Sequence, residues 1–158
     1  MRISLADVLF LASALAVFIG DRVTKMMASE YLSHISTPVF PGLKLTLMFN
    51  TGISFSLFSS PQGVIAWELT AVIAVVVALL IVAWRYYAVT RTADIAFGLI
   101  IGGAVGNFVD RVCIGGVIDF IELYYGRWSW PTFNGADVAI VIGFILLVSE
   151  ALYETKAE

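Results

Sequence analysis

The chain has 158 residues, of which 60% are hydrophobic and only 13% are charged, and its net charge is −3. This composition places it among membrane proteins. The acidic and basic residues are scattered, which excludes the basic stripe typical of a nucleic-acid-binding protein. The single cysteine, Cys113, excludes an intrachain disulfide.

Four segments are apolar enough to cross a bilayer, which takes about 20 helical residues. They use most of the chain, so we predict one integral membrane domain, residues 1–158, of the all-α class with four transmembrane helices. The first segment resembles a signal peptide, but it ends without a small-residue cleavage site, and we expect it to be retained. The segments are approximately residues 3–20, 64–84, 93–112 and 136–153.

The distribution of basic residues favours an orientation with both termini in the cytoplasm. Arg85 and Arg91 flank the short loop between the second and third segments, which the positive-inside rule places on the cytoplasmic side. Arg22 and Arg111 lie at segment ends on the outer side and weaken this count.

Asp21 and Lys25 follow the first segment and are four residues apart, so on a helix they share one face. Two interpretations remain open. The residues form either an ordinary ion pair at the membrane surface or part of a site built on the outer side.

The hydrophobic pattern changes between residues 31 and 60. Apolar residues alternate with other residues from Leu43 to Phe49, and the alternation resumes after Asn50 from Ile53 to Leu57, which is typical of strands. Because an open strand edge cannot face lipid, we predict a small extracytoplasmic hairpin or sheet that forms a cradle over the membrane helices.

The third segment has one side of small residues and a polar end. Gly98, Gly102 and Gly106 are four residues apart, a spacing that permits close helix contact. Asn107 and Asp110 follow at membrane depth and must face protein or water. We expect Asp110 to pair with a nearby base and hold the end of the helix.

Two carboxylates lie beside the last apolar segments. Asp137 falls three residues after Asn134, a good N-cap, so helix capping alone could explain it. Asp119 lies among apolar neighbours, and capping does not explain it. Two carboxyls that meet cannot both ionise easily, so the pair would share one proton and could activate a water molecule as general base and general acid.

Other chemistries fit less well. Metal ligation needs three or four convergent ligands, and the only histidine, His34, has no such partners, so we expect no metal and no cofactor. A serine–lysine dyad could join Lys25 to a serine such as Ser54, but Asp21 already lies one turn from that lysine.

Two further classes of protein remain as alternatives. One is a small proton- or ion-coupled transporter that uses the same carboxylates, and the other is a scaffold in which Asp119 and Asp137 cap helices. A transport path would place polar residues in mid-membrane with access from both sides. Here the polar residues map to one side, namely Asp21, Asn107, Asp110, Asp119 and Asp137.

The chain resembles the lipoprotein signal peptidase family (signal peptidase II), which are membrane aspartic peptidases of bacteria. Five motifs in the same order carry the resemblance over nearly the whole length. They are Asp21 with Lys25, the segment 50–55 (Asn-Thr-Gly-Ile-Ser-Phe), the segment 102–111 ending in Gly-Asn-Phe-Val-Asp-Arg, the segment 116–121 (Gly-Val-Ile-Asp-Phe-Ile) and the segment 130–137 (Trp-Pro-Thr-Phe-Asn-Gly-Ala-Asp).

The resemblance implies that Asp119 and Asp137 are the catalytic dyad. It implies that the substrates are diacylglyceryl-modified prolipoproteins, cut just before the lipidated cysteine, and that the enzyme is a monomer among membrane lipids. It further implies a bacterial inner-membrane location with the active site near the outer face. The implied site-lining residues are Asn50, Gly52, Asn107, Arg111 and Asn134, and the implied supporting residues are Asp21, Lys25 and Asp110.

One position departs from the family pattern. Ser54 replaces the alanine usual at that point of the motif. A hydroxyl there leaves the dyad intact and bears on fine specificity.

Overall fold

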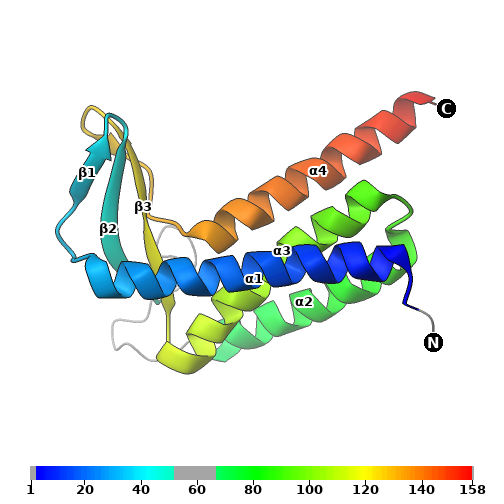
Figure 1. Ribbon diagram of the computed structural model, residues 1–158, viewed down its shortest axis with the longest axis horizontal. Helices are drawn as coiled ribbons and strands as arrows, with labels where there is room; N and C mark the ends of the chain where they lie inside the picture. Colours follow the sequence, from blue (N-terminus) through cyan, green and yellow to red (C-terminus); the bar gives the residue numbers. More distant parts are fainter. Residues whose placement is uncertain (1–2, 52–66, 158) are drawn as a thin grey trace.

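A computed structural model describes residues 3–51 and 67–157 as four helices and a small sheet. The helices lie along one another, the sheet covers one end of them, and both chain termini lie at the opposite end (Figure 1). The elements are α1 (Leu5–Tyr31), β1 (Thr37–Phe40), β2 (Leu43–Asn50), α2 (Trp67–Tyr87), α3 (Arg91–Ile114), β3 (Val117–Tyr125), β4 (Trp128–Ser129) and α4 (Gly135–Ala157).

Three helices of the described part are long and apolar enough to cross a membrane, in the segments Thr70–Tyr87, Arg91–Ile114 and Gly135–Tyr153. By this measure three of the four predicted spans are found, and the first is not. The helix α1 is longer than the predicted segment 3–20, and it carries Asp7 near its start and several charged residues beyond Gly20, so its apolar stretch is too short.

Local sequence signals set the helix boundaries. Ser4 and Asp7 form a reciprocal capping box at the start of α1, in which each side chain accepts a hydrogen bond from the backbone N–H of the other, at 3.1 and 2.9 Å. Thr90 caps α3 by accepting from the N–H of Ala93. Gly115 ends α3 in the left-handed conformation, with φ of 79°.

The helix α3 is the central element, packed against α1, α4 and α2. Its glycines make the close contact that their spacing predicted. A Cβ atom on Gly102 would lie 2.5 Å from the carbonyl oxygen of Ala14 in α1, and one on Gly103 would lie 2.5 Å from that of Ala136 in α4. The three helices therefore approach to backbone contact, as small residues allow in membrane proteins.

The four strands form one antiparallel sheet in the order β1-β2-β3-β4. The alternation from Leu43 to Phe49 was correctly predicted as a strand, and Pro38 lies in the edge strand β1, where a missing N–H is tolerated. The expected continuation from Ile53 to Leu57 lies outside the described residues. The sequence did not predict that β2 pairs with the distant strand β3.

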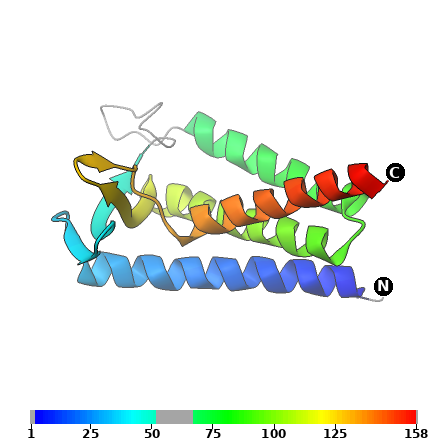
Figure 2. The ribbon, with the colours of Figure 1, turned by 90° about the horizontal axis from the view of Figure 1, so that it is seen from above.

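The strand β3 decides where Asp119 lies. Asp119 was expected at the edge of an apolar membrane segment, but it stands inside a strand, directly opposite Met48 of β2. Figure 2 shows the sheet capping the same end of the bundle where α4 begins. This brings the middle of β3 to the first turn of α4.

The close packing of α3 gives a test of the fold. We expect Gly102→Ala to lower the free energy of unfolding by about 1–3 kcal/mol, because the added methyl group meets backbone that cannot move away. Thermal unfolding in detergent measures the effect. The matched control is Gly20→Ala, where an added Cβ meets nothing within 4 Å and no loss is expected. Equal melting temperatures for the two variants would contradict the packing.

Candidate active site

The first turn of α4 positions Asp137 through a capping box. The side-chain oxygen of Asn134 accepts from the N–H of Asp137 at 3.0 Å, and the Asp137 carboxylate accepts from the N–H of Asn134 at 3.1 Å. The predicted N-cap role of Asn134 is therefore confirmed. Asn134 is fully buried, so its remaining amide hydrogens must also find partners inside the protein.

A short backbone strap fixes the start of α4 against the strand β3. The carbonyl oxygen of Phe133 accepts from the N–H groups of Phe120 and Ile121 at 3.1 and 2.9 Å, and the N–H of Phe133 donates to Ile121 at 3.0 Å. Since Phe133 directly precedes Asn134, these bonds hold the cap residue beside Asp119. Residues 15 positions apart thereby reach hydrogen-bond distance.

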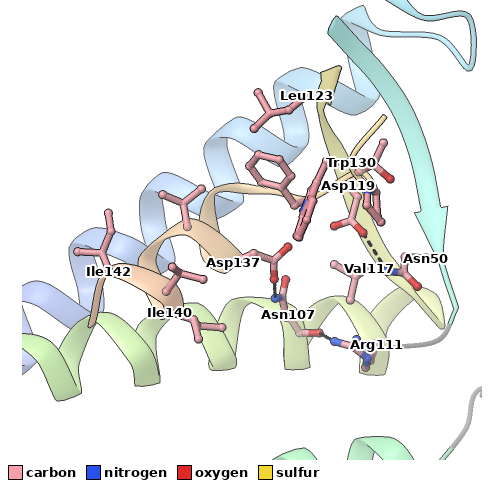
Figure 3. A pocket seen from close by; sticks show the side chains of 15 residues that line it. Asn50, Asn107, Arg111, Val117, Asp119, Leu123, Trp130, Asp137, Ile140 and Ile142 are labelled. Atoms are coloured by element: carbon pink, nitrogen blue, oxygen red, sulfur yellow. Dashed lines mark hydrogen bonds between the residues drawn. The ribbon is translucent and has the colours of Figure 1, made fainter. Parts of the chain in front are cut away.

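Three asparagine amides hold the two carboxylates, and Figure 3 shows two of them, Asn50 and Asn107. Asp119 accepts from the Nδ2 groups of Asn134 at 2.7 Å and Asn50 at 3.0 Å, one on each oxygen. Asp137 accepts from Nδ2 of Asn107 at 2.8 Å in addition to its backbone donor. Each carboxylate therefore has a fixed orientation and a donor on both oxygens.

Both carboxylates line one open cavity of about 550 Å³. Arg111 also lines the cavity, and its guanidinium donates to the carbonyl oxygen of Asn107 at 3.1 Å. The rest of the wall is largely apolar, so the cavity joins a polar end that holds two acids to a surface suited to a hydrocarbon chain. The apolar wall includes Val117, Leu123, Trp130, Phe133, Val138 and Val141.

Burial changes the acidity of Asp119, whose residue is only 2% exposed. Loss of water, with a smaller contribution from the nearby Asp137 charge, raises the pKa of this carboxyl to about 6, although the hydrogen bond from Asn50 acts in the opposite direction. Because the pKa is higher in the folded protein than in the unfolded chain, where it is about 3.9, this group stabilises the folded protein at low pH. The stabilisation is complete below about pH 3.9 and is lost as the pH rises through about 6. In the folded protein Asp119 therefore holds its proton to a higher pH than a free aspartate does.

A charged cluster lies behind the amides. Lys25 forms ion pairs with Asp21 and Asp110, both at 2.8 Å, and Asp110 also pairs with Arg22. Asp21 and Lys25 form the ion pair that their spacing predicted, but both residues are buried inside the protein. The predicted pairing of Asp110 with a base is confirmed, with two bases in place of one.

The sequence predicted the polar residues of the site but not its apolar wall. Asn50, Asn107, Arg111, Asp119 and Asp137 line the cavity, and Asn134 lies behind it. Gly52 and Ser54 lie outside the described residues. The apolar wall was not predicted, although the aromatic residues of the segment 124–130 mark it as a loop at the membrane surface.

His34 is exposed, and its Nδ1 lies 2.7 Å from the carbonyl oxygen of Leu47, as an interfacial histidine would. In the described ranges 3–51 and 67–157, no three His, Cys, Asp or Glu residues form a group that could hold a metal ion. The absence of a metal from the reaction stays a prediction.

This fold and site define a small helical membrane protein in which one buried acid and one half-buried acid face a largely apolar cavity. Comparison of structures agrees, since a bacterial membrane enzyme determined by the in meso method at 2.3 Å resolution superimposes with a TM-score of 0.82. That enzyme is 29% identical, and the match covers 94% of this chain and 90% of the enzyme.

Sequence comparison identifies the family. The profile of signal peptidase (SPase) II matches residues 13–153. A lipoprotein signal peptidase of Cupriavidus taiwanensis is 40% identical over 156 residues, which cover 97% of this chain and 88% of the relative. One of Aquifex aeolicus is 36% identical over 150 residues, with coverage of 94% and 89%. The chain belongs to the signal peptidase II family and is a peptidase.

The environment of Asp119 can be tested by titration. We expect its side-chain carboxyl, followed by ¹³C NMR in detergent micelles, to titrate with a pKa near 6. Asn50→Ala removes a donor to the ionised form and should raise this pKa further. Ser36→Ala, a change just before β1, should leave it unchanged. A pKa near 4 in the unmodified protein would contradict the burial of this group.

Proposed function

We propose that the protein is an aspartic endopeptidase that removes the signal peptide from prolipoproteins, with Asp119 and Asp137 as the catalytic dyad. The observation that carries the proposal is the pair of carboxylates on the wall of one cavity, each held by amide donors. Its relatives are lipoprotein signal peptidases, which fits hydrolysis of a peptide bond at the membrane.

The two acids have different roles in this reaction. Asp137, with a donor on both oxygens, is the ionised general base that takes a proton from the attacking water. Asp119, whose pKa is raised by burial, is the partner that carries the proton when it reacts, and it donates that proton to the carbonyl oxygen of the scissile bond as the oxygen gains charge. The tetrahedral intermediate then collapses as the C–N bond breaks. The proton held by Asp137 passes to the leaving amine, and the hydroxyl that becomes the product carbonyl returns its proton to Asp119.

The remaining residues of the site hold this geometry. Asn50 and Asn134 orient the Asp119 carboxyl, and Asn107 orients that of Asp137. Arg111 adds a positive charge to the cavity wall near the developing negative charge. From the family motif, Gly52 shapes the same site.

The apolar wall supports a lipid-modified substrate. We propose that the enzyme cuts just before a diacylglyceryl-modified cysteine, whose hydrocarbon chains lie along the wall formed by Trp130, Phe133 and α4. The reaction uses no cofactor, and the enzyme acts as a monomer. Fine preference near Ser54 follows from the hydroxyl that this chain carries in place of the family's usual alanine.

The exposed surface supports a fourth membrane span. One side of α1 exposes a row of large apolar side chains at helical spacing, namely Val8, Leu11, Leu15 and Ile19, which is typical of a face in contact with lipid. We therefore propose that α1 crosses the bacterial inner membrane with the other three helices. Both termini lie at the end away from the sheet (Figure 1), so we place them in the cytoplasm and the site near the outer face.

Substitution of the acids tests the function. We expect Asp119→Asn and Asp137→Asn each to lower kcat/KM by about 10²- to 10⁴-fold, because each removes one half of the acid–base pair. Turnover of a diacylglyceryl-modified prolipoprotein peptide by purified enzyme, followed by mass spectrometry, measures this. Glu122→Gln, on the same strand but outside the cavity wall, should keep its activity. Substantial turnover by either aspartate variant would refute the assignment.

A further inference from the structure

Lys25 is a buried ammonium group with three oxygen atoms close to it. Its residue is 0% exposed, and Nζ lies 2.8 Å from Asp21 Oδ2, from Asp110 Oδ2 and from Asn107 Oδ1. The contact with Asn107 is a hydrogen bond, and the contacts with the two carboxylates are ion pairs, of which the one to Asp21 Oδ2 lacks hydrogen-bond geometry. Two partners are carboxylates that balance charge, and the third is a neutral amide that also touches the proposed dyad.

The contact with Lys25 decides how the Asn107 amide is oriented. An ammonium has no acceptor, so the atom of Asn107 that faces it must be the oxygen. The nitrogen of the same amide then faces Asp137 and donates to Oδ1 at 2.8 Å. A rotated amide would set donor against donor at Lys25 and oxygen against oxygen at Asp137.

Asn134 supports this orientation only weakly. Its Nδ2 lies within reach of Asn107 Oδ1 at 3.1 Å, Asp119 Oδ1 at 2.7 Å and the carbonyl oxygen of Ile118 at 3.3 Å. Two amide hydrogens serve three acceptors, and the shortest contact is to Asp119. Lys25 makes the shorter and charge-assisted bond to Asn107, and such bonds are the stronger kind.

We infer that Lys25 is a positioning residue for peptide hydrolysis, which locks the Asn107 amide so that it donates to Asp137. This inference rests on the proposed function of the dyad. Lys25 does not line the cavity, so it acts on the reaction through Asn107 and not through contact with substrate.

A comparison with Arg22 can distinguish the orientation of Asn107 by Lys25 from a general effect of its positive charge. Lys25 and Arg22 are the cations beside Asp21 and Asp110, so the cluster contains two charges of each sign. Arg22 binds Asp110 in the same cluster, but no bond joins it to Asn107 among the contacts seen in the described chain. Arg22→Gln therefore removes one positive charge and keeps the amide lock, which makes it the matched control for Lys25→Met.

Kinetics with purified enzyme and a diacylglyceryl-modified peptide give the first test. We expect Lys25→Met to lower kcat by roughly 10- to 100-fold with little change in KM, whereas Arg22→Gln keeps kcat. Because Lys25 acts through Asn107, the loss of kcat from Lys25→Met should nearly vanish in an Asn107→Ala background. Full additivity of the two changes, or equal loss of kcat in the Arg22 control, would overturn the inference.

A second variant guards against misfolding. Lys25→Met leaves two buried acids with one cation. The double variant Asp21→Asn/Lys25→Met removes one charge of each sign, so the charges in the cluster balance again and Asp110 remains paired with Arg22. We expect this double variant to melt closer to the unmodified enzyme and still to show the lowered kcat. Recovery of normal kcat together with stability would show a merely structural role for Lys25.

A spectroscopic readout does not depend on turnover. In enzyme labelled with ¹⁵N-asparagine, the side-chain NH₂ signals of Asn107 should be two sharp, exchange-protected resonances, lost in Lys25→Met and kept in Arg22→Gln. If the unmodified enzyme fails to cut the peptide, the proposed function fails, but these signals still test the lock. Signals that survive in Lys25→Met would overturn the inference even in an active enzyme.

Discussion

A carboxylate inside a membrane protein is stable only where fixed donors replace the water it has lost, and the whole site follows from that constraint. Asp119 and Asp137 are served by three asparagine amides that come from β2, α3 and the loop before α4. No single element supplies them all. The sheet must therefore rest on the helix ends, and the helices must pack closely, before either acid is satisfied.

One structural device serves both stability and chemistry. Asn134 caps α4 with its side-chain oxygen, and the same side chain donates its nitrogen to Asp119. The capping box that could have explained Asp137 without any function also fixes the rotation of that carboxylate. Asn134 and Asp137 can therefore cap the helix and take part in catalysis at the same time. The presence of the cap does not by itself favour a scaffold over an active site.

The distribution of polar groups bears on the transporter alternative. Residues 95–106 of α3, between the buried Asp94 and Asn107, carry no polar side chain and include the glycines that press against α1 and α4. Asp94 is held by the indole of Trp84 at the other end of the helix. Two polar regions separated by a closely packed apolar layer do not form a continuous path for ions, which favours a site open to one side.

Sequence alone determined the apolar segments, the strand pattern of Leu43–Phe49, the cap at Asn134 and the pairing of Asp21 with Lys25, because each depends on neighbours within a few residues. It also singled out the two acids, since buried charge is costly wherever the chain folds. Only the tertiary structure decided that Asp119 lies on a strand paired with β2 and that Arg22 joins the cluster. The amide bonds to Asp119 and the ion pair of Arg22 with Asp110 join residues 15 to 88 positions apart, and no local pattern specifies such distant partners.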